Sequence, residues 1–523
     1  MKKLPKILCA LTAAATIVCT ALPLSACAKG QNELVLRVSN WEEYIDLGDW
    51  DDGELIDIDN PYDPEAGGVI GVNSMVDDFT AWFNSTHDYT VRVEYSTFGT
   101  NEDLYNRLNL GDAYDLVCPS DHMIMQLMRE DRLTKYSDGF YDTGVETNYY
   151  ANNVSTFITD NLGNIPSVGN LNEYAAGYMW GTTGIVYNPE KVEADDVKSW
   201  NILRDKKYAR QVTVKDNVRD SYFPALGILN SDALLEGTGD PDELLNATDD
   251  ETIEKALEIL KEIKENVYSF ETDSGKADMI TGKVLTNYQW SGDAVFIMDE
   301  ADDDDNHTEL WYSVPDECTN LWFDGWVMLK DGIGGNERKR EAAEAFVNFL
   351  SRPDNAIRNM YYIGYTSAIA GDVVHDYLDW NYDASEIYDE SELDEKTYSY
   401  DVSNFFGEDA EPITVDKATL EIGDDGNINR GRQLFAQYPP KNITDRSVIM
   451  VDFGDRLAAI NQMWINVRCL DVKDFNPAVV WSVVVIVVVA VAAILLYKFR
   501  YQIFYRRPKE INENAESEQN SIN

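Results

Sequence analysis

Hydrophobic positions follow two alternating periods along the first third of the chain, and they predict strands and helices in turn. Apolar runs of strand length occupy 33–38, 90–95 and 115–118. Apolar residues at helical spacing follow these runs at 75–84, 101–110 and 123–130. This order predicts an α/β fold in which helices cover parallel strands.

The pattern continues through the second half of the chain. We expect strands at 183–187, 211–214, 294–298 and 325–329, and helices at 252–266 and 341–350. The helix over 252–266 has the clearest apolar face, formed by Ile253, Leu257, Leu260 and Ile263.

Two acidic stretches lie between these elements. The first, 46–71, also contains glycine and proline, and it is expected to be a surface insertion. The second, 299–305, lacks the glycine and the final glutamate of an EF-hand loop. A solvated turn is therefore expected there, and a calcium site is not.

The start of the chain is typical of a bacterial export signal. Lysines precede an apolar run over 7–22, and the sequence Leu-Ser-Ala-Cys that ends at Cys27 resembles a lipobox. We expect 1–26 to be a lipoprotein signal peptide, Cys27 to carry the lipid, and 27–33 to be a tether. An ordinary cleavage site between small residues is the alternative.

The other end carries a second candidate membrane segment. The run over 478–497 is almost entirely Val, Ile, Ala and Leu, and it is long enough to cross a bilayer as a helix. Acidic Asp471 and Asp474 precede it and basic residues follow it, which predicts a cytoplasmic tail over 498–523. A buried core helix is the alternative, but this run has no polar face. The body is thus expected outside the cell membrane, in an extracellular or periplasmic position.

Composition narrows the class of partner. The formal net charge of −50 at pH 7 argues against nucleic acid and would concentrate cations near the surface. The body of about 450 residues is too large for one hydrophobic core, so two lobes are expected. Beyond Cys27 the cysteines are Cys118, Cys318 and Cys469, an odd set that predicts neither a disulfide framework nor a zinc site.

Enzyme motifs are missing from the sequence. It has four histidines, and it contains no Gly-x-Ser-x-Gly elbow, no His-Glu-x-x-His pair and no Walker A loop. We therefore expect no catalytic activity, no cofactor and no metal.

The run Trp322-Phe323-Asp324 is a candidate cation site. On an extended chain Trp322 and Asp324 point to the same face, which places a flat aromatic surface beside a carboxylate. An alkylammonium ion is attracted by both groups, and a desolvated cation–π contact contributes about 2 kcal/mol. The alternative is a core aromatic beside a turn carboxylate.

Aromatic and polar residues recur near the carboxyl ends of the expected strands, where open α/β sheets bind ligands. They are Trp41, Glu42, Glu43 and Tyr44 after the first strand, Ser120 and His122 after 115–118, Asp216, Asn217 and Asp220 after 211–214, Trp290 before 294–298, and Tyr365 in a glycine turn.

Five short motifs in this order carry a family resemblance. They are Ser-Asn-Trp-Glu-Glu-Tyr at 39–44, Tyr-Asp-Leu-Val-Cys-Pro-Ser at 114–120, Trp-Gly-Thr-Thr-Gly at 180–184, Trp-Phe-Asp at 322–324 and Ile-Gly-Tyr at 363–365. Together they resemble the spermidine/putrescine-binding proteins of polyamine ABC importers over 34–455.

The resemblance implies a type II periplasmic-binding fold with two α/β lobes that close on a polyamine. It implies a first lobe of 34–181 and 323–373 and a second of 182–322 and 374–470. The aromatic box would be Trp41, Tyr44, Trp290, Trp322 and Tyr365. Asp324 and Asp220 would pair with ammonium groups, and Glu43, Ser120, His122 and Asn217 would complete the ligand contacts.

Three positions depart from the family pattern. Asn217 replaces a carboxylate, His122 replaces a tyrosine, and Met450 stands at the position of an amine-capping glutamine. Losing a carboxylate weakens recognition of one amine, since a buried unpaired ammonium is costly. The resemblance therefore implies a receptor that binds putrescine or spermidine and delivers it to ABC permease subunits. A receptor for another small solute, or a sensory receptor, is the alternative.

Overall fold

The computed structural model describes residues 33–304, 307–469, 485–486 and 488–498. The chain divides into two compact units, Met1–Val467 and Arg468–Asn523, and the fold below is that of the first. The expected signal peptide 1–26, Cys27 and most of the tether lie outside the described residues.

The amino-terminal strands form the parallel arrangement that the sequence predicts. Strand β1 (Glu33–Trp41) lies between β2 (Thr90–Phe98) and β3 (Leu116–Val117) and is parallel to both. Helices α1 (Met75–Thr86), α2 (Asn101–Leu110) and α3 (Asp121–Arg129) come between or after these strands. Ser74 and Thr100 cap α1 and α2, because each side chain accepts a hydrogen bond from a backbone N–H in the first turn.

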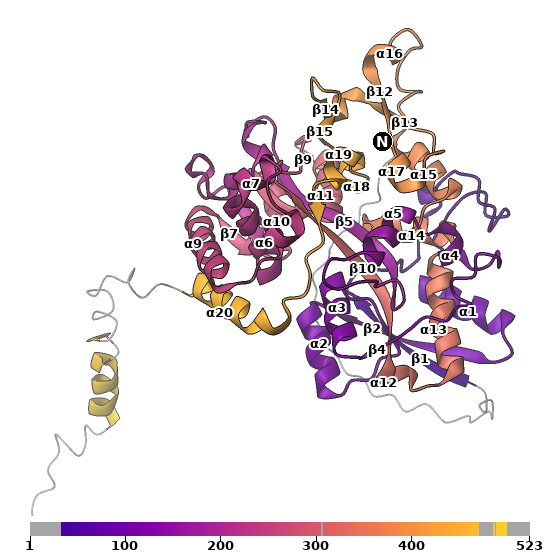
Figure 1. The fold of residues 1–523 in the computed structure, drawn as a ribbon, viewed down its shortest axis with the longest axis horizontal. Helices are drawn as coiled ribbons and strands as arrows, with labels where there is room; N and C mark the ends of the chain where they lie inside the picture. Colours follow the sequence, from indigo (N-terminus) through magenta and orange to yellow (C-terminus); the bar gives the residue numbers. More distant parts are fainter. Residues whose placement is uncertain (1–32, 305–306, 470–484, 487, 499–523) are drawn as a thin grey trace, which may run out of the picture. The chain divides into compact units, whose positions relative to one another are not determined.

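A second parallel group forms around β6 (Val212–Lys215). Strands β7 (Ser269–Glu271) and β8 (Thr286–Trp290) both run parallel to β6. The helices of this group are α6 (Val218–Leu229), α7 (Ser231–Leu235), α8 (Pro241–Leu245), α9 (Asp250–Asn266), α10 (Ser274–Ile280) and α20 (Leu457–Arg468). In Figure 1 these helices gather apart from α1, α2 and α3, which gives the fold its two lobes.

Two long strands join the lobes. Strands β5 (Ala175–Tyr187) and β10 (Thr319–Leu329) are buried along their whole length and pair antiparallel from Val327–Ala175 to Leu321–Thr182. Beyond this stretch β5 pairs with β8, whereas the far end of β10 pairs with β3 and with β4 (Leu133–Thr134). The pair therefore crosses the middle of the molecule (Figure 1).

The remaining strands join the mixed sheet, apart from those over 397–400 and 413–416, which pair with each other in a separate sheet. The strands are β9 (Trp311–Ser313), β11 (Thr366–Ser367), β12 (Thr397–Tyr400), β13 (Ile413–Asp416), β14 (Leu420–Ile422), β15 (Ile428–Gly431) and β16 (Ser447–Val448). The helices are α4 (Tyr149–Asn153), α5 (Thr156–Gly163), α11 (Ser291–Asp303), α12 (Lys330–Ile333), α13 (Glu337–Leu350), α14 (Pro353–Ile363), α15 (Asp372–Tyr382), α16 (Leu393–Lys396), α17 (Ser403–Phe406), α18 (Gln433–Gln437) and α19 (Lys441–Thr444).

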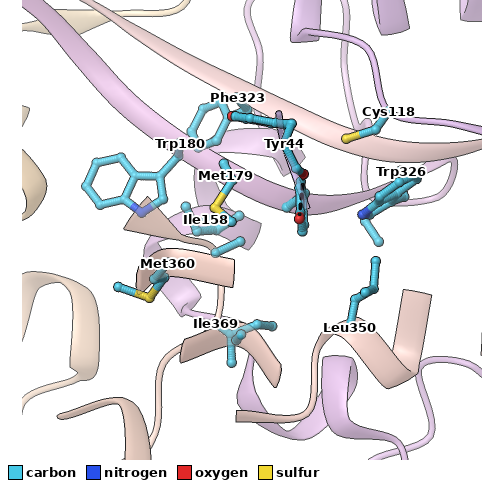
Figure 2. Packing of buried hydrophobic residues seen from close by; sticks show 14 of the residues in the cluster. Tyr44, Cys118, Ile158, Met179, Trp180, Phe323, Trp326, Leu350, Met360 and Ile369 are labelled. Carbon is cyan, nitrogen blue, oxygen red and sulfur yellow. Dashed lines mark hydrogen bonds between the residues drawn. The ribbon is translucent and has the colours of Figure 1, made fainter. Parts of the chain in front are cut away.

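The buried apolar side chains form two cores. Phe79, Trp326 and Phe346 belong to the first, and Leu260 and Tyr288 belong to the second. Figure 2 shows Tyr44 among side chains of the first core, with Trp180, Phe323 and Trp326. The lobe boundaries inferred from the sequence stay a prediction.

The expected strand at 294–298 is wrong, because this segment lies in α11. Ala294, Ile297, Met298 and Ala301 are all buried, at the i, i+3, i+4 and i+7 spacing of a helix face, while Phe296 is 40% exposed. The apolar run is so short that the spacing of its residues does not distinguish a strand from a helix. The pattern of buried residues in the structure is that of a helix.

Both expectations for the acidic stretches need correction. The stretch 46–71 is not simply a surface insertion, since Ile56 and Val69 are buried and paired, and Asp46 forms a buried ion pair with Arg358. The solvated turn expected at 299–305 is a helix as far as Asp303. Burial there raises the pKa of Asp299 to about 7.

The carboxyl-terminal apolar run is described only in part. Residues 478–484, 487 and the tail from 499 lie outside the described residues, while 485–486 and 488–498 are helical. Among the residues that are described, no helix has the length and apolar character needed to cross a membrane.

Candidate ligand-binding site

Asp324 lies in the middle of β10, at the crossing between the lobes, and is 6% exposed. Its Oδ2 accepts a hydrogen bond of 2.8 Å from the Tyr44 hydroxyl, whereas its buried Oδ1 has no hydrogen-bond partner among the described residues. Burial raises the pKa of Asp324 to about 7, although the hydroxyls of Ser120 and Tyr44 oppose the shift. A cation placed against Oδ1 would satisfy this oxygen and restore the charge of the carboxylate.

Tyr44 is fixed in the turn that follows β1. Asn40 Nδ2 and the Tyr178 hydroxyl both donate to the Tyr44 carbonyl, at 2.9 and 3.0 Å. Glu43 enables this turn with a left-handed backbone at φ 54° and leaves its own side chain exposed. The Tyr44 ring therefore meets Asp324 in a defined position.

Trp322 and Tyr365 extend the aromatic surface beside Asp324. Their ring centroids are 5.6 Å apart, and the Tyr365 ring is 5.4 Å from the Tyr44 ring. Trp322 Nε1 donates to the Thr182 carbonyl at 3.1 Å, which fixes the indole against β5. Trp322 and Asp324 thus face one aromatic cluster, as their two-residue spacing predicts.

Two glycines make room for these rings. A Cβ at Gly181 would lie 2.3 Å from Ser291 Oγ and 2.6 Å from Trp322 Cζ2. A Cβ at Gly292 would lie 2.4 Å from the Tyr365 ring. Any larger residue at either position would have to displace an aromatic side chain of the cluster.

A second group of polar residues adjoins the cluster through Asp293, in the first turn of α11. Asp293 Oδ1 accepts a hydrogen bond of 2.9 Å from the Tyr365 hydroxyl. Its Oδ2 lies 3.5 Å from Nζ of Lys215, whose ammonium lies 3.9 Å from the centroid of the Trp290 ring. Acidic and aromatic side chains therefore continue from Asp324 to Trp290.

Asp220 and Asn217 lie at the start of α6, and Asp220 contacts the indole nitrogen of Trp290. Trp290 Nε1 donates to Asp220 Oδ1 at 3.4 Å, and the Asn217 amide donates to Oδ2 of the same carboxylate. Asn217 also caps α6 by accepting from the Asp220 backbone N–H at 2.8 Å. Burial raises the pKa of Asp220, against the hydrogen bond from Asn217 and the charge of Lys215.

Among the other predicted ligand residues, Ser120 pairs with Asp324 through the backbone, whereas Trp41 and His122 make their contacts elsewhere. The Trp41 ring packs on Phe98 at 4.8 Å, and His122 lies in the first turn of α3 beside Asp121. Burial and the charge of Arg219 together lower the pKa of His122 to about 3. In the described structure no hydrogen bond or ring contact joins Trp41, Glu43 or His122 to Asp324.

A residue that caps an amine of the ligand would have to reach the cluster. Met450, at the position of such a residue, does not. Its side chain belongs to the second core, and its carbonyl accepts a hydrogen bond from Arg219. Arg219 also stacks on Phe453, 4.5 Å from its ring centroid.

Sequence reasoning missed Lys215 and Asp293. Asp293 lies in the first turn of a helix over 291–303. The sequence analysis expected a strand at 294–298 instead, and therefore did not single out Asp293. Lys215 is the last residue of β6, a position that signals a site in α/β sheets. Within the described residues, no cluster of three His, Cys, Asp or Glu side chains could hold a metal ion.

Known proteins resemble this chain in sequence. Residues 74–374 match the model of the family described as bacterial extracellular solute-binding protein. The chain is 30% identical over 282 residues to the spermidine/putrescine-binding periplasmic protein of Escherichia coli K12, covering 54% of this chain and 71% of that protein. It is 26% identical over 365 residues to the putrescine-binding periplasmic protein SpuD of Pseudomonas aeruginosa, covering 68% and 82%.

Solved structures resemble the fold. A Listeria monocytogenes protein assigned to spermidine/putrescine ABC transport aligns with a TM-score of 0.53 at 19% identity, over 83% of this chain and 98% of that one. The TpPotD lipoprotein of Treponema pallidum aligns with a TM-score of 0.50 at 18% identity, over 83% and 99%. The prediction of a two-lobed α/β periplasmic-binding fold is confirmed.

Proposed function

The chain belongs to the family of bacterial extracellular solute-binding proteins, and we propose that it binds putrescine or spermidine between its lobes and delivers it to ABC permease subunits. Its relatives in Escherichia coli and Pseudomonas aeruginosa are named for binding these polyamines. Members of this family bind solutes and are not enzymes, so we expect this protein to carry its ligand without changing it chemically.

The buried, unpartnered oxygen of Asp324 carries the proposal. Tyr44 donates to the other oxygen of this carboxylate, and the rings of Tyr365 and Trp322 continue from Tyr44, yet Oδ1 accepts no hydrogen bond among the described residues. An alkylammonium group would supply the missing donor, while its methylene groups would pack on the rings. A neutral ligand would leave the carboxylate uncompensated.

Lobe closure is the proposed mechanism. Tyr44 and Ser120 follow strands of one parallel group, whereas Trp290 and Asp220 adjoin strands of the other. A ligand that contacts both sets would favour a closed arrangement, with β5 and β10 as the connections that bend. The permease would recognise that closed form.

Anchoring to the membrane at both ends is part of the proposal. It comprises cleavage after 1–26, a lipid on Cys27, a helix over 478–497 and a cytoplasmic tail over 498–523, as the sequence predicts. Protease added to intact cells should then remove the body and spare a tag placed at the carboxyl end. Digestion of that tag in intact cells would contradict this topology.

Isothermal titration calorimetry of the full chain in detergent tests the ligand. We expect binding heat with putrescine or spermidine, and none with 1,4-butanediol, which matches putrescine in length but carries no charge. Absence of heat with every polyamine would overturn the proposed function.

A further inference from the structure

A buried lysine lies on the Trp290 side of the aromatic and acidic cluster. Lys215 is 1% exposed, and its ammonium lies 3.9 Å from the centroid of the Trp290 ring. The ammonium also lies 3.5 Å from Asp293 Oδ2 and donates to the Thr272 carbonyl at 3.0 Å. These are the contacts that an alkylammonium ligand would seek, namely an aromatic face, a carboxylate and a carbonyl.

The carboxylates near Lys215 are already engaged. Asp293 Oδ1 accepts from the Tyr365 hydroxyl at 2.9 Å and lies 3.7 Å from the ammonium of Lys276. Both oxygens of Asp220 accept hydrogen bonds, from Trp290 Nε1 and from the Asn217 amide. A ligand ammonium arriving here would find no unpartnered oxygen on these two residues.

The Tyr44 side of the cluster is different. Asp324 Oδ1 has no partner among the described residues, and Glu43, next to Tyr44, is exposed. Glu43 immediately precedes Tyr44 in the turn after β1, so its exposed carboxylate belongs to this side. This side offers two acidic groups to a ligand.

We infer that Lys215 is a built-in cation of the binding site, which fills the ammonium position on Trp290 and makes the site selective for short diamines over triamines. The inference rests on the proposed function. A diamine needs two negative partners, and Asp324 and Glu43 supply them. The additional ammonium of a triamine would meet the Lys215 ammonium at Trp290, where like charges repel in a desolvated environment.

Titration of the full chain in detergent with putrescine and spermidine, at one pH and ionic strength, tests the inference. We expect the unmodified protein to bind putrescine tighter than spermidine by about tenfold or more. Lys215→Met keeps the alkyl stem on Trp290 but removes the charge. It should tighten spermidine binding by about tenfold and change putrescine binding by less than about threefold.

Two variants serve as controls. Lys215→Arg keeps the positive charge, so it should retain the preference for putrescine. Lys283→Met removes an exposed lysine that pairs with Asp278, and it should leave both affinities unchanged. If circular dichroism shows that Lys215→Met is unfolded, the inference is tested by the other two proteins. Both the unmodified protein and Lys215→Arg should then bind putrescine more tightly than spermidine.

Spermidine binding as tight as putrescine binding in the unmodified protein would overturn the inference while leaving the proposed function intact. An unchanged ratio of the two affinities in a folded Lys215→Met protein would do the same. A protein that binds neither amine would overturn the proposed function itself, which is a separate outcome.

Discussion

Polyamine binding should weaken as the pH falls from 8 to 6, because the ligand needs an ionised Asp324. Burial raises the pKa of this carboxyl to about 7 in the ligand-free protein, whereas a bound ammonium would hold it ionised. At pH 8 most of the ligand-free protein then has the charged form. At pH 6, one unit below the pKa, ionising the group costs about 1.4 kcal/mol, so the affinity should be about tenfold weaker.

Calorimetry in two buffers measures this linkage directly. At pH 7 binding should release a fraction of a proton, so the apparent enthalpy will differ between phosphate and Tris. Asp324→Asn should weaken polyamine binding, and the affinity of this variant should be the same at pH 6 and pH 8. Equal affinity at pH 6 and pH 8, with no buffer effect, would refute the assignment of Asp324 as the ammonium partner.

Other buried carboxyls near the site must be separated from Asp324. Burial raises the pKa of Asp121 to about 6, and it also raises the pKa of Asp220. Asp121→Asn and Asp220→Asn are therefore matched controls, and the step centred near pH 7 should persist in both. His122 does not titrate in this range, because its pKa is lowered to about 3.

Three further predictions concern the same cluster. Asp324→Asn should raise the melting temperature of the ligand-free protein at pH 8 but not at pH 4. The pKa of Asp324 is higher in the folded than in the unfolded protein, so the wild-type protein loses stability as the pH rises toward 7, and the neutral amide does not. Equal shifts at both pH values in calorimetric scans would contradict this. Trp322→Ala should weaken polyamine binding by about tenfold, or about 1.4 kcal/mol, measured by titration, and an unchanged affinity would make this indole purely structural. Gly181→Ala should lower both affinity and melting temperature, because its Cβ would lie 2.6 Å from Trp322 Cζ2, whereas Gly99→Ala has nothing within 4 Å of the added atom and should behave like the unmodified protein.

Local pattern was enough to predict the amino-terminal part of the fold. Strands and helices between 33 and 130 alternate because each short apolar run is followed by residues at helical spacing, and β1, β2 and β3 do pair in parallel. The helix over 252–266 is confirmed for the same reason, since one face is apolar. Each of these elements is encoded within its own local stretch of sequence.

The pairing of β5 with β10 could not be read from the sequence in this way. It joins Ala175 to Val327, and such a contact depends on the folding of everything between them. The Lys215 contact with Trp290 and Asp293 has the same origin, because β6, β8 and α11 meet only in the folded sheet. Sequence therefore indicated the Asp324 side of the cluster and missed the internal cation on the other side.

The crossing of β5 and β10 also has a consequence for the order in which the protein folds. Strand β3 pairs with β1 on one edge and with β10 on the other, yet β10 is synthesised about 200 residues after β3. Until then the first lobe has an open sheet edge, which can pair with another chain. A chain that stops before Thr319 should therefore aggregate, and folding of both lobes should be completed together, late, when β10 takes its place.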